Sequence, residues 1–286
     1  MKYANSLEIN KYYTKSISIN KNKKFEFNII KKFDQSINNK KFALFAHYDI
    51  NNIIDDYVFY YINELSKLEY NIILITSNTL QYFVDTSIIS SIIIRKGKGY
   101  DFTNWACAFA AYPELFSANE ILLCNDSVFG PINPIKPIHD VMNSKDCDFW
   151  GLSDNQEITP HIQSYYMVFK KNAVQSSTFK DIFSANYVNT REEAIFIESN
   201  LTTILFKAGL KPFSYVSYRQ MPINKISYVH YFWKPLIKWC GFPFIKRNLL
   251  TGLIPWIDTS SWQNVLTDKH YNINLILNYL LRIIKR

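Results

Sequence analysis

The chain has 286 residues, of which 48% are hydrophobic and 16% aromatic, and it contains only 7 glycines. This composition excludes a disordered or low-complexity chain and is typical of a globular protein with a substantial core, which we expect to form one compact unit. The formal charge of +8 is concentrated in residues 1–40, where nine lysines face Glu8, Glu26 and Asp34. We therefore expect a basic N-terminal arm, residues 1–40, ahead of a nearly neutral body.

The basic arm and the lack of long apolar segments indicate which partners and which cellular location to expect. A basic arm suits solvent or an anionic membrane surface, and it lacks the interleaved aromatic residues of a nucleic-acid site, so we expect no nucleic-acid partner. The start has no apolar signal region, and no apolar run reaches the ~18 residues that span a bilayer. The four cysteines show no paired spacing, which disfavours zinc and disulfides. We expect a cytoplasmic protein, either free or peripheral on the inner face of the cytoplasmic membrane.

The first half of the chain alternates between apolar runs and segments with helical spacing. Runs that read as strands lie at 42–46, 70–78, 90–101 and 120–127. Helical spacing of apolar residues occurs at 53–68 and 101–116. Because strands and helices alternate, the pattern predicts an α/β fold with a mainly parallel, Rossmann-like sheet.

Polar residues follow most of these predicted strands. In parallel sheets, ligands bind in the crevice at the carboxyl ends of the strands. The side chains expected to gather there are His47, Asp49, Ser77, Asp101, Asn125 and Asp126. The sequence therefore predicts a ligand site at this edge of the sheet.

Beyond residue 131 the pattern is mixed. The stretch 147–155 predicts a strand and turn, 161–171 a half-buried strand and 191–209 a helix. No linker or repeat separates the halves, so we expect a donor half at about 41–131 and an acceptor half at about 132–255 within one domain, 41–255. Residues 256–286 are expected to form an amphipathic helical tail that packs on the domain or rests on a membrane.

The residues Asn125, Asp126 and Ser127 indicate the chemistry of the predicted site. A carboxylate and an amide at a strand tip suit a diphosphate and a divalent cation, Mg²⁺ or Mn²⁺, because hard cations prefer oxygen ligands. Asp126 is the candidate metal ligand, with Asn125 and Ser127 positioned to hydrogen bond phosphate oxygens. Only one carboxylate stands in this run, so the sequence leaves metal dependence open.

Seven motifs, in this order, resemble the rhamnan synthesis protein F family of bacterial polysaccharide glycosyltransferases. They are KFALFAHYD, IDDYVFYYINEL, GKGYDFTNW, EILLCNDSVFGP, DFWGLSDN, HIQSYYMVF and GFPFIKRNLL, and they span about residues 40 to 250. The resemblance implies a single-domain A-type glycosyltransferase fold. It also implies transfer of rhamnose or another deoxy, furanosyl or hexosyl sugar from a nucleotide-diphosphate donor to a glycan or lipid-linked glycan of capsule, O-antigen or rhamnan type. One departure is Gly97, where the family pattern leads us to expect asparagine.

The roles expected within this framework divide between the donor and the acceptor. His47, Asp49 and Ser77 follow strands where A-type folds hold the nucleotide. Residues expected to contact the donor phosphates, ribose or sugar are Arg95, Gly99, Asp101, Gln163, Lys246 and Arg247. Glu198 and Asp154 are candidates for the base that deprotonates the acceptor, and His161 for a catalytic or acceptor contact.

Two rival functions remain open at this stage. A sugar-phosphate transferase would use the same diphosphate site but move a phosphorus-linked group. A non-catalytic glycan-binding subunit of the polysaccharide assembly machinery would also fit the single carboxylate at residues 125–127. Hydrolysis of a nucleotide sugar would separate an enzyme from a binding module.

Overall fold

The structure is a computed structural model of the chain. It describes residues 25–37, 40–76, 87–97, 99–185, 188, 190–221 and 227–284. Ser77 and most of the expected basic arm lie outside this set. Among the described residues, no helix combines the length and the apolar character needed to cross a membrane.

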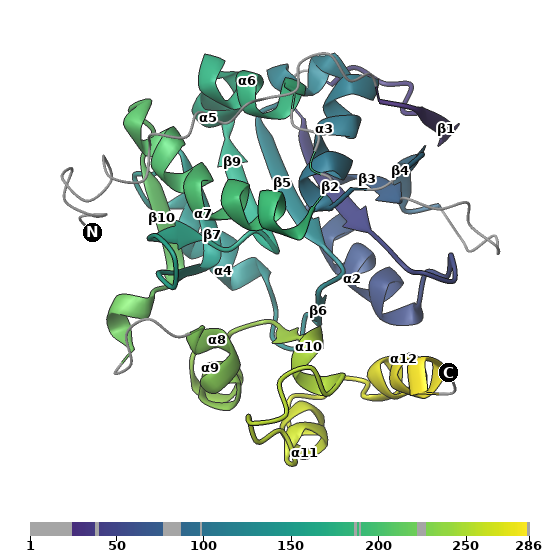
Figure 1. Ribbon diagram of the computed structural model, residues 1–286, viewed down its shortest axis with the longest axis vertical. Coiled ribbons are helices and arrows are strands. Elements are labelled where there is room, and N and C mark those ends of the chain that lie inside the picture. The colour runs from purple at the N-terminus through teal and green to yellow at the C-terminus, as the bar shows by residue number, and fades with distance from the viewer. Residues whose placement is uncertain are drawn as a thin grey trace.

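A single large sheet forms the centre of the molecule (Figure 1). In spatial order its main strands are β1 (Phe27–Lys31), β4 (Ile89–Arg95), β3 (Asn71–Thr76), β2 (Lys41–His47), β5 (Glu120–Asn125), β9 (Tyr166–Lys170), β7 (Phe149–Asn155) and β10 (Pro212–Val216). Strands β4, β3, β2 and β5 run parallel, whereas β1 and β9 pair antiparallel with their neighbours. The predicted α/β fold, with a parallel first half and a mixed second half, is confirmed.

The parallel strands are apolar because both faces of the sheet are covered. Successive residues of β2 alternate between two cores. Ala43 and Phe45 belong to one core, and Phe42, Leu44 and Ala46 to the other. All five are fully buried. Burial on both sides fixes the register of the strand, because a slip by one residue would exchange the two faces.

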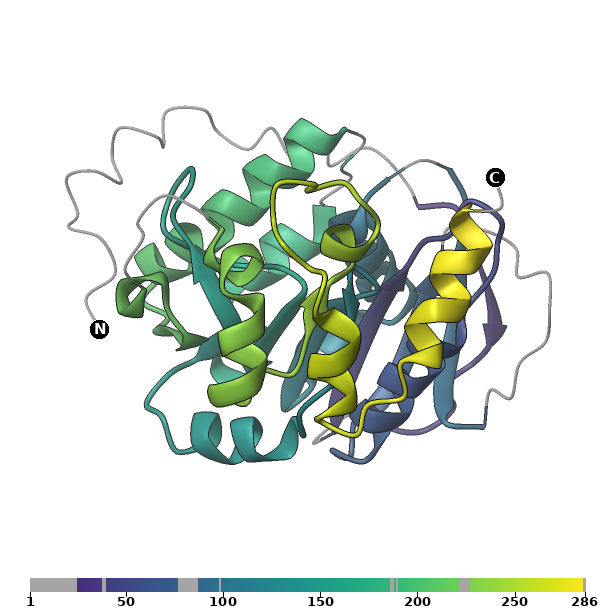
Figure 2. The ribbon, with the colours of Figure 1, turned by 90° about the horizontal axis from the view of Figure 1, so that it is seen from below.

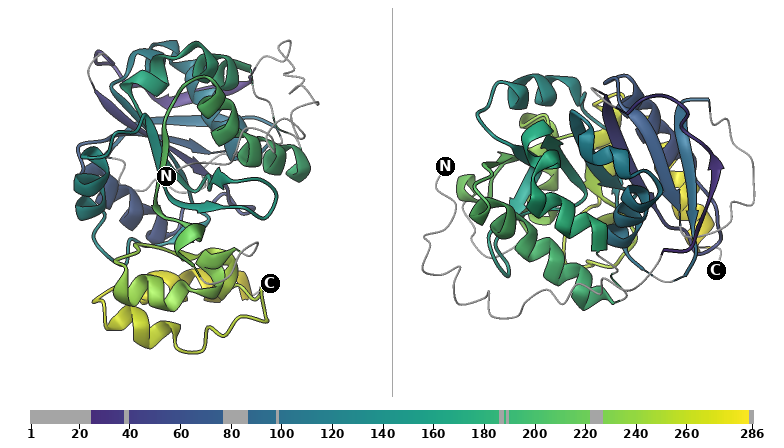
Figure 3. Two further views of the ribbon diagram at one scale, coloured as in Figure 1. Left: turned by 90° about the vertical axis from the view of Figure 1, so that its left-hand side faces the viewer. Right: turned by 90° about the horizontal axis from the view of Figure 1, so that it is seen from above.

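Helices cover both faces of the sheet. On one face lie α3 (Asp101–Ala111), η1 (Pro113–Ser117), α5 (Lys171–Gln175), α6 (Ser177–Ala185) and α7 (Arg191–Lys207). The other core includes residues of α2 (Asp56–Ser66), α4 (Lys136–Asn143), α8 (Tyr228–Tyr231), α9 (Trp233–Trp239), α10 (Arg247–Leu250), α11 (Trp262–Thr267) and α12 (Asn274–Ile284). Figures 2 and 3 show that α8 to α12 form a layer of their own beneath the sheet, and that α12 lies along α2.

A short two-stranded ladder brings this C-terminal layer to the tip of β5. Strand β6 (Val128–Phe129) follows β5 and pairs antiparallel with β11 (Ile245–Lys246). Between them Gly130 has a φ of +142°, and a Cβ at this position would lie 2.4 Å from the carbonyl oxygen of Pro243. Glycine is therefore required where the two chain segments cross.

Two features differ from the sequence expectations. Residues 161–171 are not one strand: β8 (His161–Ile162) pairs with β7, a turn follows, and β9 then enters the main sheet. The turn is held because Glu198 accepts hydrogen bonds from the backbone and hydroxyl of Ser164. In addition, β1 lies within the range expected to be an arm, and it forms the edge of the sheet by pairing with β4.

Candidate functional site

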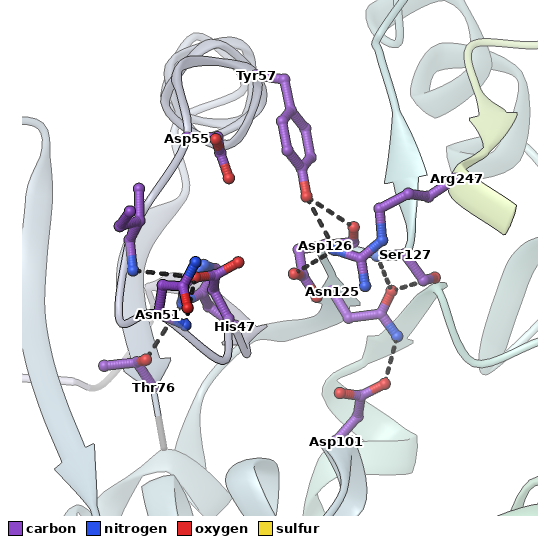
Figure 4. Close-up of polar contacts among 12 residues, drawn as sticks. His47, Asn51, Asp55, Tyr57, Thr76, Asp101, Asn125, Asp126, Ser127 and Arg247 are labelled. Atoms are coloured by element: carbon purple, nitrogen blue, oxygen red, sulfur yellow. Dashed lines mark hydrogen bonds and ion pairs between the residues drawn. The ribbon is translucent and has the colours of Figure 1, made fainter. Parts of the chain in front are cut away.

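The carboxyl ends of the parallel strands meet at one edge, as expected, because the strands are in register. His47 of β2 pairs with Thr76 of β3, and Ala46 of β2 pairs with Asn125 of β5. Helix α3 begins at the same edge with Asp101. The sheet thus brings side chains from β2, β3, β5 and α3 together (Figure 4).

At the tip of β5, Asn125 connects two neighbouring groups. Its Nδ2 donates to Oδ2 of Asp101 over 2.6 Å. Its Oδ1 accepts from the backbone N–H of Ser127 at 3.1 Å and from the Ser127 hydroxyl at 2.6 Å. This arrangement fixes the amide orientation, because the nitrogen faces a carboxylate and the oxygen faces two donors.

Asp126 is held by an arginine from the C-terminal layer. Nη1 of Arg247 donates to Oδ2 of Asp126 over 2.8 Å and to the Tyr57 hydroxyl over 3.0 Å. The Tyr57 hydroxyl in turn donates to the backbone oxygen of Asp126 at 3.2 Å. The side chains of Arg247 and Asp126 are only 26% and 7% exposed, so the ion pair is shielded from solvent.

The carboxyl group of Asp101 has an unusual pKa. Burial raises its pKa, the nearby Asp126 carboxylate raises it further, and the hydrogen bond from Asn125 only partly opposes them, giving a value of about 7. The Asp101 carboxyl group therefore takes up a proton more readily than an exposed aspartate does.

Lys246 of β11 pairs with Val128 just after Ser127, and it is close enough to the carboxylates of Asp101 and Glu198 to interact with both electrostatically. Its Nζ is 3.5 Å from the centre of the Tyr165 ring, a cation–π contact. Burial lowers the pKa of Lys246 to about 8, against the opposing effects of the Glu198 and Asp101 carboxylates. The lysine therefore connects the Asp101 cluster electrostatically with Glu198 on α7.

A pocket of ≈ 520 Å³ opens on the other side of Glu198. Its wall is formed by residues of β7, β8, α7 and α8 and by the loop between α10 and α11. His161, Gln163, Arg191 and Glu198 all line it. Arg191 and Glu198, two turns apart on α7, thus face one space, as their spacing predicts.

The predicted site residues that cluster around the tip of β5 are Asp101, Asn125, Asp126, Ser127, Lys246 and Arg247, and Glu198 both influences this cluster electrostatically and lines the pocket. His161 and Gln163 instead line the pocket. Gly99 stands just before α3 with a φ of +154°, and a Cβ there would be 2.9 Å from Cβ of Thr103, so its contribution is to the backbone turn. Ser77 lies outside the described residues.

Arg95 and Asp154, for which substrate-contacting roles were predicted, are engaged in internal contacts. Buried Arg95 donates to Oδ1 of Asn104 at 2.7 Å and to the carbonyl of Gly97 at 2.9 Å, so it braces the glycine turn. Asp154 is buried and accepts from the hydroxyls of Ser214 and Ser217 at 2.9 and 2.7 Å. The backbone N–H of Tyr218 is a third donor to this carboxylate. Both side chains are thus buried and bonded to protein groups, and the donor role of Arg95 and the base role of Asp154 stay predictions.

His47 and Asp49 are also occupied by protein groups. Nδ1 of buried His47 lies 3.1 Å from the Thr76 hydroxyl, and burial lowers the pKa of this imidazole. Arg282 of α12 bridges two carboxylates, with Nη2 at 2.7 Å from Oδ2 of Asp49 and Nε at 2.9 Å from Oδ1 of Asp55. We call this contact the Arg282 clamp. It takes up the Asp49 oxygens that were expected to meet the nucleotide.

Sequence reasoning missed several residues of this region: Tyr57, Tyr231, Trp256 and Arg282. Tyr57 and Arg282 lie at helical spacing and read as ordinary helix residues. Trp256 could have been found, because a tryptophan after Pro255 in a glycine- and proline-containing loop is a signal for an exposed aromatic side chain.

The residues at the edge do not fit a metal centre built on paired carboxylates. Among the described residues, no three His, Cys, Asp or Glu side chains are grouped so as to hold a metal ion. The candidate ligand Asp126 has one oxygen bonded to Arg247, and Oδ2 of Asp101 is bonded to Asn125. The positive charge at this edge is supplied by Lys246 and Arg247.

Comparisons with known proteins give one family and several distant likenesses. The family model described as rhamnan synthesis protein F matches residues 74–286. Two curated relatives, both called virulence protein VirA and both from Vibrio anguillarum, one of them strain ATCC 68554 / 775, are each 27% identical over 293 residues, covering 87% of this chain and 88% of the relative.

The similar solved structures are more remote. A cytidylyltransferase from Leptospira borgpetersenii is 12% identical with a TM-score of 0.38, covering 80% of this chain and 97% of that one. The mannosyltransferase Ktr4p from S. cerevisiae is 10% identical with a TM-score of 0.32, covering 63% and 70%. At these TM-scores neither likeness bears on the chemistry of the site.

Proposed function

The chain belongs to the rhamnan synthesis protein F family of polysaccharide glycosyltransferases, and from this premise we propose that it moves a sugar from a nucleotide-diphosphate donor to a surface polysaccharide. The sugar is rhamnose or another deoxy, furanosyl or hexosyl sugar, and the acceptor is a glycan or lipid-linked glycan of the capsule, O-antigen or rhamnan type. The observation that carries the proposal is the placement of Lys246 and Arg247 beside Asn125 and Ser127 at the sheet edge, next to Glu198.

In this proposal the diphosphate of the donor contacts the side chains of Arg247 and Lys246. Both contacts of Arg247 to Asp126 and Tyr57 use Nη1, so the Nη2 side of the planar guanidinium faces no other described hydrogen-bond partner and suits a phosphate oxygen. The Ser127 hydroxyl and Asn125 amide hold the loop that the phosphates approach. Because the two cations lie in a poorly solvated edge, their stabilisation of a leaving diphosphate is greater than in water.

Glu198 is the proposed base. It takes the proton of an acceptor hydroxyl while that oxygen bonds to the anomeric carbon, and the bond from that carbon to the diphosphate oxygen breaks with its electron pair on the leaving group. Its Oε1 is fixed by the two hydrogen bonds from Ser164, each 2.7 Å. It stands between the cationic cluster and the pocket, which is where donor and acceptor would meet.

A thermal-shift panel tests the donor. With UDP, GDP, CDP, dTDP and their sugars at about 100 times Kd, one nucleotide should stabilise the protein by about 2.7 kcal/mol. The shift should persist in EDTA, because Lys246 and Arg247 supply the positive charge.

The same panel, together with analysis of the nucleotide released from each nucleotide sugar, separates the rival functions. A protein that binds no nucleotide, with or without Mg²⁺ or Mn²⁺, would be a glycan-binding subunit instead. Release of nucleoside monophosphate in place of diphosphate would identify a sugar-phosphate transferase. A thermal shift that vanishes in EDTA and returns with Mn²⁺ would show that donor binding requires a divalent cation.

Contact with an anionic membrane surface belongs to the same proposal. Leu281 and Ile284 lie three residues apart on α12 and are exposed, and Lys285 and Arg286 follow them in the sequence. Such a mixture of apolar and basic residues suits the boundary of acidic lipid headgroups.

Co-sedimentation with phosphatidylglycerol vesicles tests this contact. The double variant Leu281→Ser/Ile284→Ser should bind several-fold less than the unchanged chain, because it removes exposed apolar surface without changing charge. Ile30→Ser, which removes an exposed side chain on the edge strand β1, is the control. Equal binding by all three proteins would refute the α12 contact.

A further inference from the structure

The pocket beyond Glu198 combines polar groups at its base with exposed apolar and aromatic side chains. Trp256 is 70% exposed and Tyr231 43% exposed, and both line the pocket. The isoleucines Ile158 and Ile195 on its lining are exposed as well. Exposing a large apolar indole ring to water is unfavourable unless a ligand covers the ring. A cluster of exposed apolar and aromatic side chains around one pocket therefore indicates a binding site.

The polar groups of the pocket are fixed in orientation. Nδ1 of buried His161 donates to the carbonyl oxygen of Thr159 over 2.7 Å, which fixes the orientation of the ring and leaves Nε2 as its other hydrogen-bonding atom. Gln163 accepts from the Ser153 hydroxyl through Oε1 at 2.8 Å, which leaves its amide nitrogen as a donor. Preset donors and acceptors of this kind recognise hydroxyl groups in defined positions.

We propose that this pocket is the saccharide acceptor site, with Trp256 and Tyr231 stacking on the C–H face of a sugar ring and His161 and Gln163 hydrogen bonding its hydroxyls. The inference rests on the proposed function, because it gives Glu198 its substrate. A sugar presents one apolar face and a rim of hydroxyls, which matches the aromatic edge and polar base of the pocket. Its volume, ≈ 520 Å³, lies within the usual ~300–1,000 Å³ of small-ligand sites.

Two other occupants fit less well. A lipid chain in the pocket would cover Nε2 of His161 and the amide nitrogen of Gln163 with hydrocarbon, and burying polar atoms in this way is costly. A nucleotide diphosphate would need cations on the pocket wall, but Lys246 and Arg247 are not among the residues that line it. Arg191 is the cationic side chain there, at the start of α7 and seven residues from Glu198.

Saturation-transfer NMR tests the site directly. The probes are the methyl glycosides of rhamnose, glucose, galactose and N-acetylglucosamine and a methyl dirhamnoside. We expect at least one probe to receive saturation on its ring C–H protons. Trp256→Ala should weaken that binding by roughly tenfold, equivalent to about 1.4 kcal/mol, and Trp256→Phe should restore part of it because a ring remains for stacking.

Trp239→Ala is the matched control, because Trp239 is 79% exposed on α9 and does not line the pocket. Each variant is also tested for its thermal shift with the nucleotide that the panel identifies, and Trp256→Ala should keep that shift. A chain that binds nucleotide but no glycoside, or whose glycoside binding survives Trp256→Ala, would refute the acceptor site while leaving the donor proposal standing. If the protein without substitutions binds no nucleotide, the proposed function itself is refuted.

Discussion

Replacing Glu198 with glutamine should lower kcat for sugar transfer by roughly 10²–10⁴-fold, the usual contribution of a general base. Glutamine has the same shape, and its amide oxygen can still accept from the backbone and hydroxyl of Ser164. The turn that follows β8 should therefore persist. The substitution removes the ability of residue 198 to take a proton but removes no proposed contact with the donor. KM for the donor should therefore stay within about twofold of its original value.

The measurement is the initial rate of nucleoside diphosphate release with the donor found in the thermal-shift panel. Glu192→Gln is the matched control, because Glu192 lies on the same helix in an exposed position. An unchanged rate in Glu198→Gln would remove this residue from the reaction. A parallel rise in KM for the donor would instead indicate that Glu198 helps to hold the nucleotide sugar.

Replacing Arg247 with alanine should reduce both donor binding and stability. Nucleotide affinity should fall by at least tenfold, because the diphosphate loses its charged fork. The variant also leaves Asp126 as a shielded carboxylate without its cation. Removing one partner of a buried pair costs ~3–5 kcal/mol, and because Arg247 is a quarter exposed we expect about 2–3 kcal/mol here.

The double variant Asp126→Asn/Arg247→Met separates the two effects. It should recover most of the free energy of unfolding, since no unpaired charge remains, but it should not recover nucleotide binding. Denaturant unfolding and calorimetry measure the two quantities. Lys136→Ala serves as the control, because the Lys136–Asp140 pair is exposed and should contribute less than ~1 kcal/mol. Full nucleotide affinity in the double variant would show that Arg247 is a structural residue only.

The residues at the carboxyl edge of the sheet could be predicted from the sequence, because the end of each parallel strand can be recognised from a short stretch of residues. Each apolar run is a strand, each polar tip lies where that strand ends, and parallel strands bring those tips together. Asp101, Asn125 and Asp126 therefore meet as expected. The direction of the Asn125 amide did not follow from the pattern, because it depends on the neighbours that a folded chain provides.

Contacts between distant segments could not be predicted in this way. Arg282 and Asp49 are 233 residues apart, and Arg247 and Asp126 are 121 apart, with no periodicity to connect them. Asp154 lies near the end of strand β7, as Asn125 does at the end of β5, yet hydroxyls from Ser214 and Ser217 bond to its carboxylate. A polar residue at a strand end shows where a carboxylate lies along the chain, but its partners decide whether it can meet a ligand.

The Arg282 clamp and the Arg247–Asp126 ion pair join the C-terminal helices to the parallel strands, so they affect which fragments of the chain can be stable. A fragment ending near residue 131 would keep the four parallel strands but lose Lys246, Arg247 and Arg282. Asp49 and Asp55 would then lose the arginine that lies between them, and Asp126 would lose its ion-pair partner Arg247. We therefore expect the fragment to be less stable than the full chain, and chimaeras with related proteins should exchange the segment from β11 to α12 along with the parallel strands.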